Sequence, residues 1–381
     1  MMRTATVFNP SKDHPMSHLL PRSSSRARLA VFSLLCVALV ACGGTDDAND
    51  EATRANEPMP TPNPQMQAVL DELAALGAKP INTLTVAQAR AQPSPADAVK
   101  SLLVKQGKST APEPVGSVED RVIAGPGGGI PIRIYKPAGA GPFPVALYIH
   151  GGGWVIATID TYDSSARALT NAAGAIIVST HYRQAPEFKF PAAHDDTYAA
   201  YKWTLANATA LGGIAKQVAV VGESAGGNMA AAITLRARDE GIQRPVHQVL
   251  VYPVTNYAFD SPSQQQNRNA SPLNTAALAW FYERYLPTPA DGSNPQFSVL
   301  RAPTLAGLPA ATVITADIDP LRSEGRAYAE RLAAAGVAVD YANYAGVTHE
   351  FFGMGAVLAE ARTAVARAAS NLKASFAKAG T

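Results

Sequence analysis

Cysteine is scarce in this sequence: its 381 residues include only Cys36 and Cys42, both near the amino terminus. The body of the chain therefore has no disulfide, and its core must be held together by packing alone. Charged residues are also few, at 16% of the chain against 47% hydrophobic residues. This composition allows one large α/β domain or two smaller ones.

An apolar run long enough to cross a bilayer as a helix is missing as well. The segment LAVFSLLCVALVAC, residues 29–42, is too short to span, and an arginine-rich stretch precedes it. This arrangement is typical of the core of a signal peptide. We expect the signal to occupy residues 1–41, with translation starting at Met1 or at Met16.

The apolar run ends in LVAC, residues 39–42, which resembles the lipobox of bacterial lipoproteins. In that class of signals the cysteine carries the lipid and becomes the new amino terminus. We therefore expect an exported protein that is anchored through lipid on Cys42 to a bacterial membrane, on its periplasmic or outer-membrane side. An ordinary secretory signal cleaved nearby is the alternative.

The excess of positive charge disappears with the signal. The whole chain has 32 basic and 30 acidic residues, and residues 1–41 hold five of the basic ones and one acidic one. The remainder has 27 and 29, a net charge of −2. This balance argues against a nucleic-acid partner.

Two kinds of segment precede the first predicted strand. Residues 42–65 are polar, acidic and rich in proline, which predicts a disordered linker. Residues 66–77 have apolar side chains at helical spacing and end in Gly77, which predicts an amphipathic helix. Thr85 and Gln88 have the spacing of a capping box for a second helix.

Eight segments have the composition of strands, and most of them alternate with helical segments. The first two, VEDRVIA and IPIRIYKP, predict a hairpin around a glycine-rich turn at 125–129. Six nearly continuous apolar strands follow, at residues 144–150, 174–183, 217–222, 246–253, 310–316 and 338–344. This order predicts a mostly parallel sheet with helices on both faces.

More than fifty residues separate the strands at 246–253 and 310–316, which is too long for a simple connection. We expect an inserted helical cap there, with one helix in LNTAALAWFYERYLP, residues 273–287. The aromatic residues of that helix are candidates either for the lining of an apolar substrate pocket or for plain packing: Trp280, Phe281 and Tyr285.

The stretch VVGESAGGNM, residues 220–229, surrounds one serine with glycines. An apolar strand leads in and an alanine-rich helix leads out, so the pattern predicts a sharp turn between them. Gly222 and Gly226 would let the two arms approach closely. This is the G-x-S-x-G nucleophile elbow, with Ser224 at its apex and Glu223 beside it.

A serine nucleophile needs a base, and a third group that orients the base. His349 is the best placed of seven histidines, because it follows the last predicted strand in a glycine-bearing loop. Functional groups of parallel sheets gather at the carboxyl ends of strands. Asp317 and Asp319 both follow the strand at 310–316 and both fit the order Ser–Asp–His. The residues alone leave the choice between these two acids open.

Donors for an oxyanion are indicated by HGGGW, residues 150–154, directly after a buried strand. Three consecutive glycines let backbone N–H groups face one point without interference from side chains. A further donor is expected from the N–H of Ala225, next to the nucleophile. Trp154, which ends the motif, is another candidate for the substrate pocket.

Five motifs, in this order and spacing, resemble those of the hormone-sensitive-lipase-like family of α/β-hydrolases (bacterial family IV esterases): IHGGGW, YRQAPEFKFPAA, GESAGGNMAA, DPLRSEG and THEFFGM. The resemblance implies an α/β-hydrolase domain over residues 66–381. Its fold would be a mostly parallel eight-stranded sheet flanked by helices. Residues 66–110 and about 254–304 would form the helical cap.

The resemblance also implies residue roles. It makes Ser224, Asp319 and His349 the catalytic triad, which selects Asp319 over Asp317. His150 would support the loop and would not act as a base. The oxyanion donors would be the N–H groups of Gly152, Gly153 and Ala225, and the rest of the two motifs would be supporting residues: Gly151, Gly222, Glu223 and Gly226.

Two positions depart from the family pattern. Ser323 stands where an acid is frequent, and Glu350 stands next to the base, where glycine is common. The second departure is expected to affect leaving-group access or pH dependence.

The activity implied is hydrolysis of short-chain carboxylic esters through an acyl-enzyme, with no cofactor and no metal. Two alternatives remain. The same triad would also cleave another acyl bond, such as an amide, a formamide or a sugar acetate. A ligand-binding protein without catalysis is the second, and the intact His349 argues against it.

Overall fold

The computed structural model describes residue 51 and residues 53–380. The predicted signal peptide and Cys42 lie outside these residues. Within the described part of the chain, no helix has the length and apolar character needed to cross a membrane.

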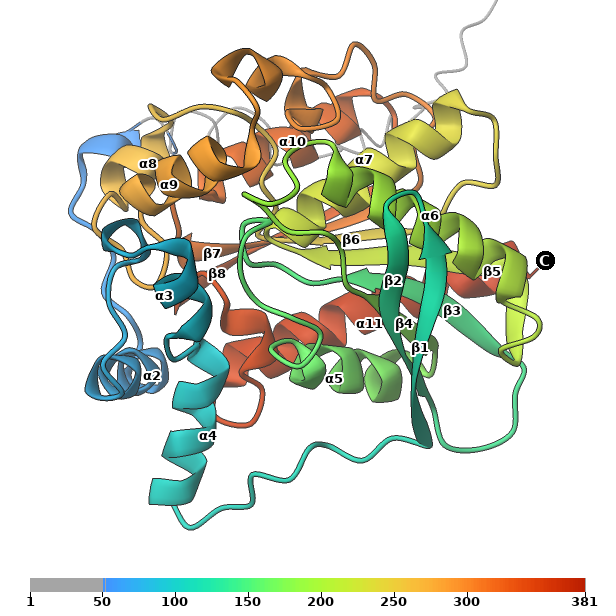
Figure 1. Ribbon diagram of the computed structural model, residues 1–381, viewed down its shortest axis with the longest axis horizontal. Coiled ribbons are helices and arrows are strands. Elements are labelled where there is room, and N and C mark those ends of the chain that lie inside the picture. Colours follow the sequence, from blue (N-terminus) through green and yellow to red (C-terminus); the bar gives the residue numbers. More distant parts are fainter. Residues whose placement is uncertain (1–50, 52, 381) are drawn as a thin grey trace, which may run out of the picture. The chain divides into compact units, whose positions relative to one another are not determined.

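An eight-stranded sheet runs through the centre of the domain in the order β1-β2-β4-β3-β5-β6-β7-β8 (Figure 1). The hairpin of β1 (Ser117–Gly125) and β2 (Gly128–Lys136) is antiparallel, and β2 is also antiparallel to β4 (Ile176–Thr180). All other neighbours are parallel: β3 (Phe143–Ile149), β5 (Gly213–Glu223), β6 (Gln248–Val251), β7 (Ala311–Ile318) and β8 (Val339–Thr348). The predicted mostly parallel eight-stranded sheet is confirmed.

Helices cover both faces of the sheet. On one face lie α5 (Asp163–Ala173) and α11 (Ala359–Ala379), and on the other lie α6 (Ala192–Asn207), α7 (Ala225–Asp239) and α10 (Arg322–Ala334) (Figure 1). Successive side chains of a strand point to opposite faces. Leu147 of β3 therefore joins the apolar cluster that contains Met229 of α7, while Tyr148 joins the cluster that contains Leu169 of α5. Burial on both faces explains why the strands are nearly continuous apolar runs.

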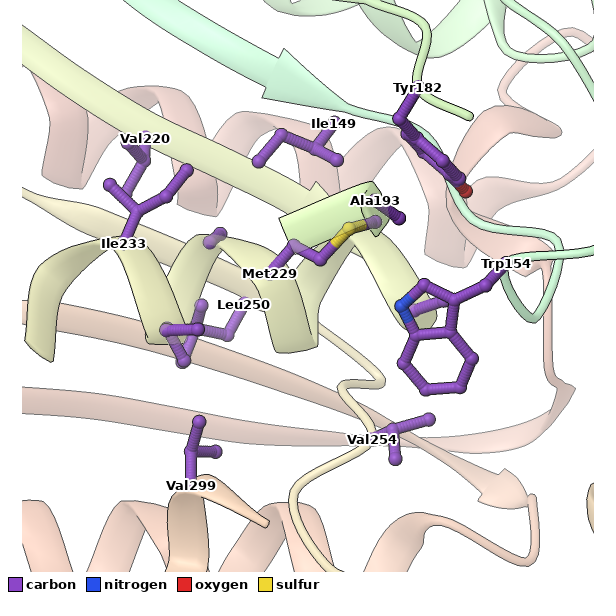
Figure 2. Packing of buried hydrophobic residues seen from close by; sticks show 14 of the residues in the cluster. Ile149, Trp154, Tyr182, Ala193, Val220, Met229, Ile233, Leu250, Val254 and Val299 are labelled. Atoms are coloured by element: carbon purple, nitrogen blue, oxygen red, sulfur yellow. The ribbon is translucent and has the colours of Figure 1, made fainter. Parts of the chain in front are cut away.

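The α7 side of the sheet carries the apolar cluster next to the site. Figure 2 shows Met229 and Ile233 of α7 between the strand residues Ile149, Val220 and Leu250. These side chains are at most 2% exposed. Because these contacts hold α7 against the sheet, they also hold Ser224, the residue directly before the helix, in place.

Two helical segments that are far apart in the sequence lie next to each other. One contains α2 (Pro64–Ala75), α3 (Val86–Ala91) and α4 (Pro95–Lys105), and the other contains α8 (Pro262–Gln266) and α9 (Thr275–Tyr285) (Figure 1). Trp280 joins them, because its Nε1 donates to the Leu84 carbonyl at 3.0 Å. These are the two segments expected to form the cap.

The helix starts in the first segment follow the capping chemistry of the sequence. Thr85 and Gln88 form the expected capping box at the start of α3. A second box, from Ser94 and Asp97, starts α4, a helix that the sequence analysis did not predict.

The prediction of a disordered linker over residues 42–65 is wrong for the part that the structure describes. Arg54 lies in a 3₁₀ turn at Arg54–Asn56, and its Nη2 is 2.6 Å from Asp317 Oδ1. Glu51 Oε1 lies 3.0 Å from Nη2 of the buried Arg322 and also accepts from the hydroxyl of Ser323. We call residues 51 and 53–56 the amino-terminal strap. Local composition misses it because its partners lie more than 250 residues later, as the separation of 271 between Glu51 and Arg322 illustrates.

Candidate active site

Ser224 lies at the junction of β5 and α7, with φ 57° and ψ −119°, a backbone conformation that residues with a Cβ rarely adopt. The glycines around it are needed for space. A Cβ on Gly222 would overlap the carbonyl of Gly226, and a Cβ on Gly226 would overlap the carbonyl of Ile149. The turn is therefore as tight as the glycine pattern predicts, and it holds the serine above the sheet.

Three side chains from three loops form one hydrogen-bonded chain. His349, after β8, has its Nδ1 at 2.7 Å from Asp319 Oδ2 and its Nε2 at 2.9 Å from Ser224 Oγ. The carboxylate accepts from Nδ1–H, so Nε2 is left to accept from the serine hydroxyl. The second oxygen of Asp319 accepts from the backbone N–H of Leu321 at 2.8 Å, which fixes the carboxylate. This arrangement suits a nucleophile, a base and an orienting acid.

The electrostatic setting of His349 favours its charged form. Burial lowers the pKa of the imidazole, but the charge and hydrogen bond of Asp319, with a further contribution from Glu350, raise it above its ordinary value. Such an imidazole takes up a proton readily from a nearby hydroxyl.

The other acid considered from the sequence, Asp317, faces elsewhere. Its carboxylate oxygen lies 2.6 Å from Arg54 and 3.3 Å from Nη1 of Arg322. Asp317 therefore belongs to the ion pairs of the amino-terminal strap, and Asp319 alone of the two meets the histidine.

Backbone donors from two elements lie near the serine, since Gly152 and Gly153 line the same cavity as Ser224 and Ala225 follows it directly. Gly152 and Gly153 follow β3 with φ 96° and 56°, and Ala225 is the first residue of α7. Within the described residues no acceptor is found for the backbone N–H groups of these three residues. The N–H groups of a first helical turn also carry the positive end of the helix dipole. This set of free donors can bind a negatively charged oxygen.

His150 supports the glycine loop. Its Nδ1 donates to the Gly151 carbonyl at 2.8 Å, which leaves Nε2 to accept from His181 Nδ1 at 2.9 Å. The hydroxyl of Tyr182 also donates to the Gly151 carbonyl at 2.9 Å. Burial, with the neighbouring His181, lowers the pKa of His150 to about 3, so its ring stays neutral in ordinary buffers.

A cavity of about 390 Å³ opens onto Ser224 and His349 between the sheet and the two helical segments. Phe281 and Trp154 are among its lining residues, as expected for the pocket. Trp280 and Tyr285 are not, so of the two alternatives expected for them the structure supports packing. Tyr285 stacks on Trp154 with ring centroids 4.5 Å apart, and Trp280 reaches the backbone of Leu84. Helical spacing cannot tell which side of α9 faces a cavity.

A group of acids and phenols lies beside the triad, and the sequence pointed only to its two acids, Glu223 and Glu350. Glu223 is buried, and its two oxygens accept from the hydroxyls of Tyr148 and Tyr252. Burial, with the charge of Glu350, raises the pKa of Glu223 to about 7. The hydroxyl of Tyr162 donates to both oxygens of Glu350, at 2.8 and 2.7 Å. No pattern in the sequence indicated that Tyr148, Tyr162 or Tyr252 would lie here.

The site combines a serine nucleophile, a histidine base and free backbone N–H donors, which together suit acyl transfer. Among the described residues, no group of three or more His, Cys, Asp and Glu side chains has the arrangement of a metal site.

Known proteins resemble this chain in sequence. An ethyl acetate hydrolase from Pseudomonas putida is 39% identical over 239 residues, 61% of this chain and 74% of that protein. The carboxylesterase NlhH of Mycobacterium tuberculosis is also 39% identical, over 271 residues, 69% of this chain and 85% of that protein.

Solved structures resemble the fold. An ester hydrolase from the metagenome of Lake Arreo, complexed with a phosphonate, has a TM-score of 0.74 at 38% identity and covers 83% of this chain and 100% of its own. A hyperthermophilic esterase from the archaeon Pyrobaculum calidifontis has a TM-score of 0.74 at 37% identity, covering 83% and 99%.

A family model described as the alpha/beta hydrolase fold matches residues 146–353, which run from β3 to the loop after His349. The matched region contains the serine elbow, the glycine loop and both other triad positions. With these relatives at 39% identity, the chain belongs to the α/β-hydrolase superfamily, in its hormone-sensitive-lipase-like branch.

Proposed function

We propose that this protein is a serine carboxylesterase that hydrolyses short-chain esters through an acyl-enzyme. The observation that carries the proposal is the continuous chain from Asp319 through His349 to Ser224, with contacts of 2.7 and 2.9 Å. The esterase names of the relatives support the same reaction.

In the proposed mechanism, Ser224 Oγ attacks the ester carbonyl while His349 Nε2 takes the hydroxyl proton. Asp319 keeps the imidazole in the required tautomer and stabilises its charged form. The oxyanion is bound by the N–H groups of Gly152, Gly153 and Ala225, each worth about 3 kcal/mol of barrier in such sites. His349 then protonates the leaving alcohol, and water later releases the acid by the reverse sequence of proton transfers.

The preference for short acyl groups rests on the pocket. Its volume of about 390 Å³ is near the lower end of the range for small-molecule sites, roughly 300–1,000 Å³. Phe281 borders the pocket and also fills the space beside Gly153, where a Cβ would overlap its ring. A bulky ring at this place shortens the space open to the substrate.

A panel of p-nitrophenyl esters from acetate to palmitate tests the proposal, together with labelling by a fluorophosphonate probe. We expect labelling at Ser224 and highest kcat/KM for acetate or butyrate. The Ser224→Ala variant should lose both labelling and turnover. A protein that turns over amides or sugar acetates but not these esters would instead support another acyl bond as the natural target.

We also propose export and lipid anchoring through Cys42, on the strength of the lipobox-like LVAC segment. Fractionation of cells that express the Cys42→Ser variant tests this. The variant should leave the membrane fraction, and retention there would refute the anchor.

A further inference from the structure

Glu350 occupies a place in the pocket wall that suits glycine better. Its φ is 72°, in the left-handed region, where a side chain with a Cβ costs about 1 kcal/mol or more. Glycine at this position would avoid that cost. A residue kept in an unfavourable backbone conformation beside reacting groups points to a use for its side chain.

The carboxylate of Glu350 is held next to the base. Tyr162 donates one hydroxyl to its two oxygens, and Oε1 lies 3.7 Å from His349 Nε2. About 21% of the side chain is exposed, and it lines the same cavity as Ser224. A separation of 3.7 Å is too long for a direct hydrogen bond and short enough for one water to bridge.

We propose that Glu350 holds the water that hydrolyses the acyl-enzyme. This inference rests on the proposed esterase function. The water oxygen attacks the acyl carbon bound to Ser224, and one of its hydrogens passes to His349 Nε2. Its other hydrogen donates to Glu350 Oε1 and stays on the oxygen. The bond from the acyl carbon to Ser224 Oγ then breaks, Oγ takes the proton from His349, and the carboxylic acid leaves.

The second hydrogen makes the role specific to water. An alcohol has a single O–H hydrogen, which must go to His349, and none is left for Glu350. The same holds for the alcohol that leaves during acylation. Its oxygen has no hydrogen until His349 protonates it, so it cannot donate to Glu350 while the bond breaks. Glu350 should therefore speed deacylation by water much more than acylation.

The charged and titratable groups around Glu350 are compatible with this role. Burial raises the pKa of Glu350, while His349 and the Tyr162 hydrogen bond lower it in part. Tyr162 uses its hydroxyl hydrogen on Glu350, and Tyr148 and Tyr252 use theirs on Glu223, so Glu350 remains an acceptor on the side of His349. The titratable groups that interact electrostatically with Glu350 are His349, Asp319, Glu223, Tyr148, Tyr162, Tyr182 and Tyr252.

The first experiment separates the two chemical steps. Wild-type protein and the Glu350→Gly, Glu350→Gln and Glu283→Gln variants are mixed rapidly with p-nitrophenyl acetate. The exposed Glu283 is a matched control on α9. We expect the burst of p-nitrophenol to change by less than about threefold in Glu350→Gly, while the steady rate falls about 10- to 100-fold and acetyl-Ser224 accumulates by intact mass. Glu350→Gln keeps an acceptor oxygen and should recover part of the steady rate.

The second experiment uses methanol as a competing nucleophile. In Glu350→Gly the ratio of methyl acetate to acetate should rise at least about fivefold above wild type, because water alone loses a partner. An unchanged ratio of methyl acetate to acetate, or equal slowing of the burst and the steady rate in a variant that is still active, would overturn the role of Glu350 and leave the proposed esterase function standing. A wild-type protein that is neither acylated at Ser224 nor active would overturn the proposed function together with it.

Discussion

The carboxylates of Asp317 and Asp319, two residues apart at the end of β7, face different partners: Asp317 meets Arg54 and Arg322, and Asp319 meets His349. A single residue of chain between them, together with the bend after the strand, is enough to separate an ion pair of the strap from the orienting acid of the site.

This separation predicts opposite outcomes for two isosteric variants. Asp319→Asn should lower kcat by about 10⁴-fold, because the amide favours the wrong tautomer of His349, and leave the melting temperature nearly unchanged. Asp317→Asn should keep most activity and lower the melting temperature, because Arg322 stays buried beside a neutral group. Ester kinetics and thermal melts of both variants check this, and equal activity in the two would contradict the assignment of the acid.

The raised pKa of His349 sets the pH dependence. The base works only in its neutral form, so kcat/KM should fall as pH drops through that pKa, which lies above the ordinary value of 6.5. The Glu350→Gln variant removes a nearby negative charge and should move this fall to lower pH. A pH profile of kcat/KM for both proteins measures the shift. His150, with a pKa of about 3, should add no step between pH 5 and 9.

The glycine loop predicts a loss of oxyanion binding in Gly152→Ala. Gly152 has φ 96°, and a Cβ there would overlap the carbonyl of Ile156. The loop must move, and loss of one donor should lower kcat by about 10²- to 10³-fold with a smaller change in KM. Gly174→Ala is a useful control, because Gly174 also has positive φ but a Cβ there meets no atom within 4 Å. Similar kinetics in the two variants would argue against the assignment of the Gly152 N–H as an oxyanion donor.

The pocket predicts a change of chain-length preference in Phe281→Ala. Removal of this ring should raise kcat/KM for octanoate relative to acetate by about tenfold, because longer acyl chains gain buried contact. Trp280→Phe, on the side of α9 that faces Leu84, should leave the preference unchanged. The ester panel with both variants measures this preference. A changed chain-length preference in Trp280→Phe alone would mean that the acyl chain binds on the other side of α9.

The amino-terminal strap predicts a loss of stability in Glu51→Ala. Arg322 would keep its buried charge and lose one of its acceptors, at a cost of about 2 kcal/mol. For a domain of this size the melting temperature should fall by roughly 3 °C. Glu57→Ala removes an exposed acid directly after the strap and should change the melting temperature little. If both variants melt like wild type, the strap contributes nothing to stability.

Local patterns were enough to predict the elements that carry the site. The apolar strands, the elbow glycines around Ser224 and the triple glycine after β3 each have a local physical cause that is visible in the chain. The resemblance then selected Asp319, a choice that depends on how the chain bends after β7 and that spacing alone left open.

Features that depend on distant partners were not predicted. Glu51 and Arg54 belong to a polar, proline-rich segment, and only Asp317 and Arg322 give them a fixed position. Which side of α9 faces the cavity depends on what packs against the helix, so the sequence left the choice between pocket and packing open for Trp280 and Tyr285. The phenols around Glu223 and Glu350 come from three separate elements, and no local pattern brings them together.

The backbone of the nucleophile has a cost that the protein keeps for the sake of chemistry. At φ 57° and ψ −119°, any side chain at position 224 is strained by about 1–3 kcal/mol, and glycine is the one residue that would relieve it. An inactive Ser224→Gly protein should therefore tolerate heat better than an inactive Ser224→Ala protein. Stability therefore favours glycine at position 224, whereas catalysis requires serine. A search for thermostable variants that ignores activity would select glycine at this position and abolish catalysis.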